Sequence, residues 1–179
     1  VALAALAGFD AGRGDFQLVQ RTAWIPVLGV EWHLGVDGLS ILFLPATTLL
    51  FLAALIVTGR GLSPAPGLHY ACVLLLECAT LGIFCALDTL LFFFFWELTL
   101  LPLYFLVGLW GLAGSGARAA TRYFMLMLGG GVPVLLAFLV LASHAGMAFD
   151  LPSLLAATPS RDTQILVFLL FVIGFGVKV

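Results

Sequence analysis

Three ionisable side chains lie inside apolar stretches of this chain, and their chemistry is considered first. Glu97 lies within the almost wholly apolar stretch 92–111, and the only lysine, Lys178, lies within the apolar stretch 163–179. A second acid, Glu77, lies near the middle of 69–87. A carboxylate at the centre of a membrane helix costs roughly 2.5 to 3.5 kcal/mol on insertion scales. Such a group faces a protein interior or water and has a partner, so the sequence favours a buried acid and base that pair.

The chemistry open to such a pair is proton transfer. In apolar surroundings the charged forms of both side chains are destabilised, whereas an ion pair at about 4 Å and an effective dielectric constant near 20 gains about 4 kcal/mol. Opening and closing a pair between Glu97 and Lys178 changes how tightly the lysine holds its proton. The alternative is that the charges only lock helices together. We favour function because two acids and a lysine lie in five predicted spans, with Glu77 as a supporting acid.

Pro102 bears on the interpretation of Glu97. A proline in a helix leaves the carbonyl four residues earlier, here that of Leu98, without its usual N–H partner. That places a polar backbone group beside the carboxylate, and it needs water or a side-chain donor. We expect a hydrated pocket at this depth; a packing kink is the alternative.

Composition places the chain in the membrane. It is 63% hydrophobic and 9% charged, with a mean hydropathy of +1.22, whereas soluble domains average about 25% charged residues. The formal charge of −2 gives no sign of a nucleic-acid surface. The sequence has no phosphate-binding loop, nucleophile constellation, haem motif or iron–sulfur motif, and its three cysteines have no metal-ligand spacing. We therefore expect no cofactor or metal on this chain, and no bond-breaking chemistry.

Apolar stretches of about 20 residues predict an all-α, polytopic membrane helix bundle. The predicted spans are 39–58, 69–87, 90–110, 119–142 and 163–179, with 1–9 as the end of an earlier span. We treat 1–179 as one transmembrane domain and as a fragment, because both ends look cut. The GGGVP run at 129–133 predicts a locally weak or kinked helix that a neighbour can approach closely.

The regions between the spans are polar. Residues 10–37 carry Trp24 and Trp32 as interfacial anchors, and Leu151, Leu154 and Leu155 predict a short helix on the membrane surface. The arginines of the two short connections, Arg60, Arg118 and Arg122, place those connections in the cytoplasm. The three histidines, His33, His69 and His144, are predicted near span ends or in a loop, with no ligand-spaced partner.

The chain resembles a known family at three places. The stretch FFFFWELTLLPLYFLVGLWG (92–111) is similar to the fifth-helix motif of the membrane-arm subunit of respiratory complex I called chain M, or NuoM, in bacteria and subunit 4 in mitochondria. The stretch WIPVLGVEWHLGVDGLSILF (24–43) resembles the segment leading into that family's third helix, and FVIGFGVKV (171–179) resembles its seventh helix. The resemblance runs from about Trp24 to Val179, with the spans in matching order.

This resemblance implies an antiporter-like fold of about fourteen helices, of which the chain holds the end of helix 2 through most of helix 7. It implies that Glu97 and Lys178 are the family's fifth-helix glutamate and seventh-helix lysine, which translocate protons. Glu77 falls on a fourth-helix position that is acidic in some members only. The second repeat and its proton-path residues are missing from the sequence, so the chain alone cannot form a complete proton path.

The resemblance implies a proton-translocating subunit of NADH:quinone oxidoreductase in the bacterial inner membrane. NADH, FMN, iron–sulfur clusters and quinone are then handled by other subunits, and the partners of this chain are other membrane-arm subunits, the lipid bilayer and protons. Two alternatives stay open: a subunit of an Mrp-type cation/proton antiporter or of a hydrogenase-linked ion pump, and a purely structural bundle.

Overall fold

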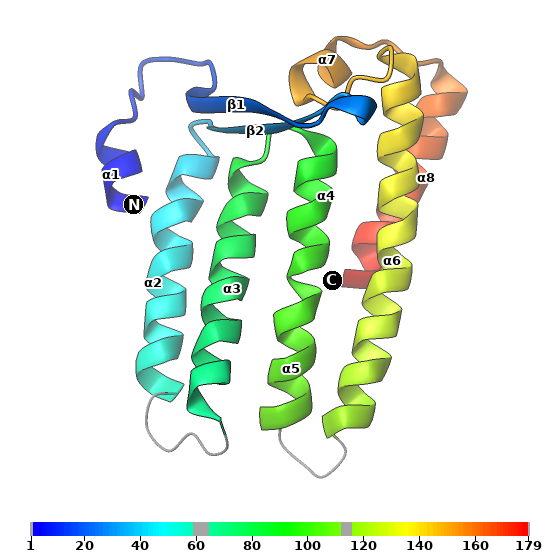
Figure 1. Ribbon diagram of the computed structural model, residues 1–179. Helices are drawn as coiled ribbons and strands as arrows, with labels where there is room; N and C mark the ends of the chain where they lie inside the picture. The colour runs from blue at the N-terminus through cyan, green and yellow to red at the C-terminus, as the bar shows by residue number, and fades with distance from the viewer. Residues whose placement is uncertain (1, 59–64, 112–115, 179) are drawn as a thin grey trace.

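The protein folds as a helix bundle with a β-hairpin across one end. The computed structural model describes residues 2–58, 65–111 and 116–178 (Figure 1). The helices are α1 (Ala2–Ala7), α2 (Ser40–Thr58), α3 (Pro66–Cys85), α4 (Thr89–Leu98), α5 (Leu100–Trp110), α6 (Gly116–His144), α7 (Leu151–Ala156) and α8 (Arg161–Lys178). The strands are β1 (Gln17–Ile25) and β2 (Val30–Val36), joined by the 3₁₀ turn η1 (Pro26–Leu28). The predominantly helical fold was predicted from the sequence.

Four helical segments are long and apolar enough to cross a membrane: α2, α3, the continuous stretch of α4 with α5, and α6. They lie close to the predicted spans 39–58, 69–87, 90–110 and 119–142. The fifth predicted span, 163–179, coincides with α8, whose 18 residues include Arg161, Asp162 and Lys178. Residues 59–64 and 112–115, which belong to the two predicted short connections, lie outside the described residues, and Arg60 is among them.

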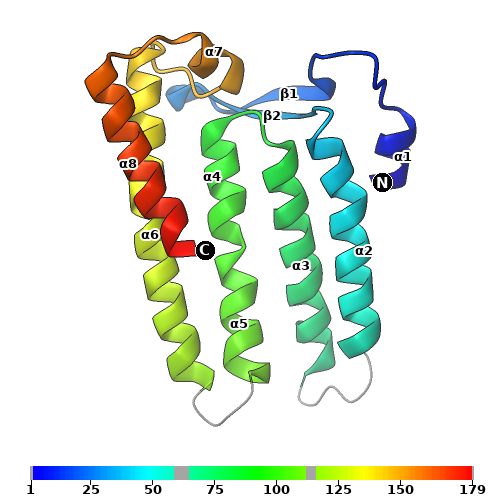
Figure 2. The ribbon, with the colours of Figure 1, turned by 180° about the vertical axis from the view of Figure 1, so that it is seen from behind.

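The helices lie side by side in the order α2, α3, α4 with α5, and α6, while α8 packs along α6 (Figures 1 and 2). Seen from behind, α8 descends from the hairpin end and stops at mid-height, beside the junction of α4 and α5 (Figure 2). This arrangement brings the C-terminal part of α8 to the level of Glu97.

The hairpin was not predicted, because the sequence analysis treated 10–37 only as a polar region. Its turn has a clear local cause: Pro26 sets the backbone for η1, and Gly29 ends it with a φ of +68°, which glycine adopts without strain. The strands pair in antiparallel register, with Thr22 opposite Trp32. The Trp32 ring lies edge-on to Trp24 and to Phe95 of α4, which ties the hairpin to the bundle.

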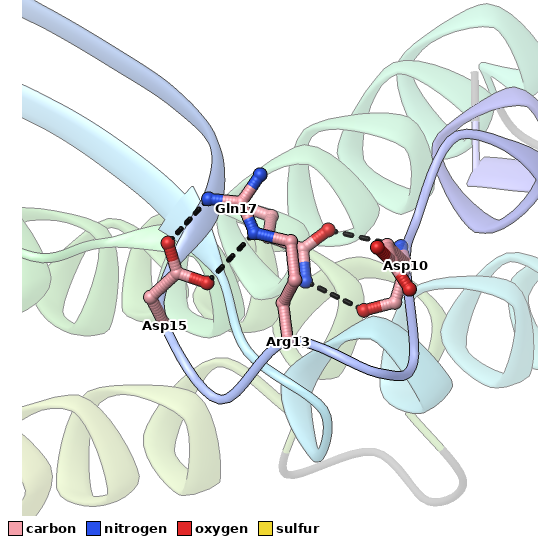
Figure 3. A network of polar contacts seen from close by, with 4 residues as sticks. All are labelled: Asp10, Arg13, Asp15 and Gln17. Carbon is pink, nitrogen blue, oxygen red and sulfur yellow. Dashed lines mark hydrogen bonds and ion pairs between the residues drawn. The ribbon is translucent and has the colours of Figure 1, made fainter.

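A polar network closes the loop between α1 and β1 (Figure 3). The Gln17 amide donates to the Asp10 carbonyl at 2.8 Å and accepts from the Asp10 N–H at 2.9 Å. Beside it, Arg13 donates to both carboxylate oxygens of Asp15, and these hydrogen bonds lower the pKa of Asp15. The loop is therefore held by local contacts, away from the helices that carry Glu97 and Lys178.

Asp88 joins the hairpin to the helices. One carboxylate oxygen caps α4 by accepting from the N–H groups of Leu90 and Leu91 at 2.9 and 3.0 Å. The other accepts from the N–H of Glu31 in β2 at 3.2 Å. The side chain is 1% exposed. The backbone on either side continues the link, because Leu87 donates to the carbonyl of His33 in β2, at 2.8 Å.

The segment before α7 docks on the same junction. The N–H of Thr89 donates to the carbonyl of Phe149, and the N–H of Leu151 donates to the carbonyl of Leu87, both at 2.8 Å. The short helix predicted around Leu151 and Leu154 is present as α7, and Asp150 caps it by accepting from Ser153. One end of the bundle is thus a continuous hydrogen-bonded layer.

Helix α6 continues through its glycine run without a break, so the predicted weakness does not interrupt it. The predicted close approach is present. A Cβ at Gly130 would lie 2.7 Å from the Val177 side chain, and one at Gly174 would lie 2.4 Å from the Val134 side chain. His144, predicted in a loop, is the last residue of α6.

We predict that Asp88→Ala destabilises the hairpin end of the bundle. It removes the α4 cap, which is typically worth about 1 kcal/mol, and leaves the Glu31 N–H without its acceptor. Asp88→Asn keeps an acceptor oxygen and should lose less. The measurement is the thermal unfolding midpoint of the full-length protein in its assembled complex, with Asp162→Asn on exposed α8 as the control. Equal midpoints for Asp88→Ala and the control would contradict the assigned role.

Candidate functional site

The site is built where α4 gives way to α5. Helix α4 ends at Leu98 and α5 starts at Leu100; Thr99 between them keeps helical dihedral angles, with φ of −61° and ψ of −26°, so this break is a local interruption of helical hydrogen bonding. Pro102 has no N–H to donate to the Leu98 carbonyl, the freed group predicted from the sequence, whereas the interruption itself was not predicted. The Thr99 hydroxyl donates to the Trp96 carbonyl at 2.8 Å. The break therefore lies two residues after Glu97, in the middle of the segment Thr89–Trp110.

Glu97 and Lys178, predicted as partners, meet at this break. The Lys178 Nζ lies 3.2 Å from Glu97 Oε1, across a sequence separation of 81 residues. The two side chains are only 12% and 18% exposed, respectively. No other ion pair in the described residues is comparably buried, since the two pairs of the hairpin region, Arg13–Asp15 and Arg21–Glu31, are far more exposed. The pair is short enough for a charge-assisted hydrogen bond.

Trp96 makes two further contacts with the lysine. Lys178 Nζ donates to the Trp96 carbonyl at 3.4 Å and lies 4.2 Å from the centroid of the Trp96 ring. The ammonium is therefore held by a carboxylate, a carbonyl and an aromatic ring from two consecutive residues of α4. Sequence reasoning missed this role, because a tryptophan in an apolar stretch looks like an interfacial or packing residue.

Gly131 of α6 forms the opposite wall of the site. A Cβ at this position would lie 2.5 Å from Glu97 Oε1, so only glycine lets the carboxylate lie against the helix. Gly130, one residue earlier, contacts Val177, the neighbour of Lys178. The glycine run at 129–133 was predicted to allow a close approach. It does so on both sides of the ion pair, because Gly131 lies against Glu97 and Gly130 against Val177.

Two buried polar atoms at the site have no hydrogen-bond partner among the described residues: Glu97 Oε2 and Trp96 Nε1. Buried polar groups normally bond to protein or to ordered water. The second carboxylate oxygen is therefore available to accept a proton or a hydrogen bond while Oε1 contacts the lysine.

A closed ring of five aromatic side chains from α4, α6 and α8 lies next to the pair. Successive centroids are 5.2 to 5.9 Å apart in the order Phe92, Trp96, Phe175, Phe171, Phe138 and back to Phe92. Four of these rings line a cavity of about 260 Å³ that extends to Asp88 and Thr89 at the hairpin end. Trp96 is therefore fixed by stacking on one side and by Lys178 on the other.

Glu77 does not join this cluster. It lies partly buried on α3, and no hydrogen bond or ion pair to it is recorded within the described part of the chain. The structure thus brings together two of the three predicted site residues. His33 and His69, predicted near span ends, are buried at 5% and 7% exposure, and the centroids of the His69 and Trp110 rings lie 4.9 Å apart.

No group of three or more potential metal-ligating side chains converges in the ranges that the structure describes. The arrangement offers a carboxylate with one oxygen that has no partner among the described residues, a lysine of opposite charge and a helix junction two residues after the carboxylate. Groups of these types can hold and release a proton.

Similarity to curated proteins points to one group of enzymes. The chain is 41% identical over 175 residues to "NAD(P)H-quinone oxidoreductase chain 4 1" of Picosynechococcus sp., covering 95% of this chain and 32% of that protein. It is 34% identical over 178 residues to "NADH-quinone oxidoreductase subunit M" of Escherichia coli, covering 94% of this chain and 35% of that protein. The chain thus spans about a third of the length of the curated relatives it matches.

Solved structures and a family model agree with this. The fold matches a chain of "Respiratory complex I from Thermus thermophilus with bound NADH", with a TM-score of 0.81 and 31% identity over 99% of this chain and 37% of that chain. A chain of the "Mrp complex from Dietzia sp." matches with a TM-score of 0.85 and 24% identity over 99% and 20%, a likeness of fold. The family model described as "NADH:quinone oxidoreductase/Mrp antiporter, TM" matches residues 86–179. This integral membrane chain belongs to the NADH:quinone oxidoreductase/Mrp antiporter transmembrane family.

Proposed function

We propose that this chain is part of a proton-translocating membrane-arm subunit of an NADH:quinone oxidoreductase, and that Glu97 and Lys178 carry the coupling. The observation that supports this most strongly is the buried ion pair at the break between α4 and α5. Intramembrane charges are costly, and those that persist commonly mark ion pathways. The similarity to chain 4 and subunit M proteins supports the same assignment.

The pair stores the proton as a charge on Lys178. At about 4 Å and an effective dielectric constant near 20, the attraction between the two charges is worth about 4 kcal/mol. When the pair opens, the ammonium loses that stabilisation in surroundings that already disfavour a charge. A movement that separates Nζ from Glu97 Oε1 therefore makes the lysine release its proton, and closure makes it take one up. Glu97 Oε2, which has no partner, is a natural acceptor beside it.

The redox chemistry belongs to other subunits in this proposal. NADH, FMN, iron–sulfur clusters and quinone are bound elsewhere in the complex, and this chain responds to them through conformational change. Its partners are the neighbouring membrane-arm subunits, lipid and protons. The start of α6, where Arg118 and Arg122 are exposed, faces the cytoplasm, and the hairpin faces the opposite side.

A cation/proton antiporter is the second candidate, because the family model covers both classes and the Mrp complex shares the fold. The two differ in what drives them. Inverted membrane vesicles of the native strain distinguish them: proton uptake that requires NADH and quinone supports the oxidoreductase. Exchange of sodium for protons without NADH supports the antiporter.

The first functional prediction concerns the pair itself. Glu97→Gln and Glu97→Ala should reduce NADH-driven proton pumping below about a tenth of wild type, since the pair loses its roughly 4 kcal/mol. Glu97→Asp should keep part of it. Lys178→Ala should be severe and Lys178→Arg poor, because a guanidinium does not deprotonate in proteins. Pumping is measured in vesicles, with assembly checked by native gel. If Lys178→Arg pumps at the wild-type rate, Lys178 need not lose its proton, and the pair only holds the helices together.

The second prediction uses the glycine wall. Gly131→Ala places a methyl group 2.5 Å from the present position of Glu97 Oε1, so the carboxylate must move and pumping should fall several-fold. Gly129→Ala is the matched control, because a Cβ there meets nothing within 4 Å. Both variants are assayed in vesicles for pumping per NADH oxidised. Equal coupling in the two variants would show that the position of the carboxylate against α6 is unimportant.

The third prediction ranks the acids. Glu77→Gln should lower pumping less than Glu97→Gln does, because Glu77 has no recorded charged partner in the described residues and lies on uninterrupted α3. The same vesicle assay compares the two variants at matched levels of assembled complex. Complete loss in both would make Glu77 an equal member of the proton path.

A further inference from the structure

We propose that Trp96 is a positioning residue for Lys178, whose indole ring holds the lysine in its charged form independently of Glu97. This inference rests on the proposed function of the pair. The ring face of a tryptophan attracts a cation and gains much less from a neutral amine. The Lys178 Nζ lies 4.2 Å from the ring centroid, well within the range of about 6 Å for such contacts.

The placement of the ring supports this role. Buried tryptophans usually find a partner for the indole N–H, yet the Trp96 Nε1 has none among the described residues. The ring is therefore not oriented by its own hydrogen bond. It is held by stacking on Phe92 and by the edge of Phe175, which leaves its contact with the ammonium as the polar interaction of the indole.

Trp96 and Glu97 act on the ammonium in different ways. Glu97 attracts it only while the carboxylate is ionised, whereas the ring does so whatever the protonation state of Glu97. The Trp96 carbonyl adds a third contact at 3.4 Å. When Glu97 takes a proton, the ring and carbonyl still favour the charged lysine. Proton uptake by Glu97 and proton release by Lys178 are thus separate events, because the ring and carbonyl still hold the ammonium after the carboxylate has gained a proton.

Other titratable groups do not account for such an effect. Within the described residues, Glu97 is the only titratable group with a recorded ion pair or hydrogen bond to Lys178. Helix α6, which packs along α8, presents Gly130 and Val134 to it, and Glu77 of α3 has no recorded contact with the pair. A change in the pH dependence of a Trp96 variant therefore reports on the ring.

The experiment measures the pH profile of proton pumping per NADH oxidised, in vesicles that contain the whole complex. Trp96→Leu removes the ring face, and the alkaline limb of the profile should move to lower pH by about half to one unit. Trp96→Phe keeps a weaker ring and should shift less. Phe94→Leu is the control: it removes an exposed ring of the same helix that contacts Trp24 and Phe95 and has no recorded contact with Trp96 or Lys178 in the described residues, so its profile should keep its position.

The outcomes separate this inference from the proposed function. An unshifted limb in Trp96→Leu, or an equal shift in Phe94→Leu, means that Trp96 only packs, and overturns the inference. If Glu97→Ala and Lys178→Ala pump normally in the same vesicles, the proposed function fails instead. Assembly is checked for every variant, and Trp96→Phe, which preserves most of the packing, keeps the test decisive where Trp96→Leu assembles poorly.

Discussion

A carboxylate and an ammonium taken out of water together each lose several kcal/mol of hydration, and only close geometry offsets that loss. In this chain the two charged residues are 81 positions apart in the sequence, yet Lys178 Nζ lies 3.2 Å from Glu97 Oε1. Two neighbouring features of the structure make this short distance possible. The break at Thr99 exposes backbone polarity beside Glu97, and Gly131 lets the carboxylate lie against α6. Around the charged pair, the bundle is thus irregular at Thr99 and closely packed at Gly131.

The hairpin end of the bundle has a different requirement from the site: it must be rigid. Asp88 is almost fully buried, and its two oxygens connect the start of α4 to β2. The backbone of Leu87 and Thr89 extends the connection to β2 and to the segment before α7. As a result, α4 is fixed in position about two turns before Glu97. The hairpin therefore contributes to the site indirectly, because it holds α4, the helix that carries Glu97.

The sequence predicted what is chemically unusual and missed what is chemically ordinary. Glu97 and Lys178 stand out because charge is rare in an apolar stretch, and Pro102 identifies the freed Leu98 carbonyl because proline lacks an N–H. Trp96 does not stand out, because an aromatic residue among phenylalanines carries no sign of the cation it contacts. The hairpin was missed for a physical reason: β1 is exposed along nearly its whole length after Gln17, so it lacks the alternation of buried and exposed residues that identifies a strand.

The proposed proton carrier needs a place where movement costs little, and the break at Thr99 offers one. Bending a continuous helix breaks hydrogen bonds between successive turns, but Pro102 has already removed the donor for the Leu98 carbonyl. The Thr99 hydroxyl bonds to the Trp96 carbonyl, so part of the local backbone is satisfied by a side chain that can move with it. A small rotation at Thr99 would move α5 relative to α4, which carries Trp96 and Glu97 and stays anchored at Asp88. The backbone polar groups beside the carboxylate would then change their position, while the aromatic ring and the carboxylate keep theirs.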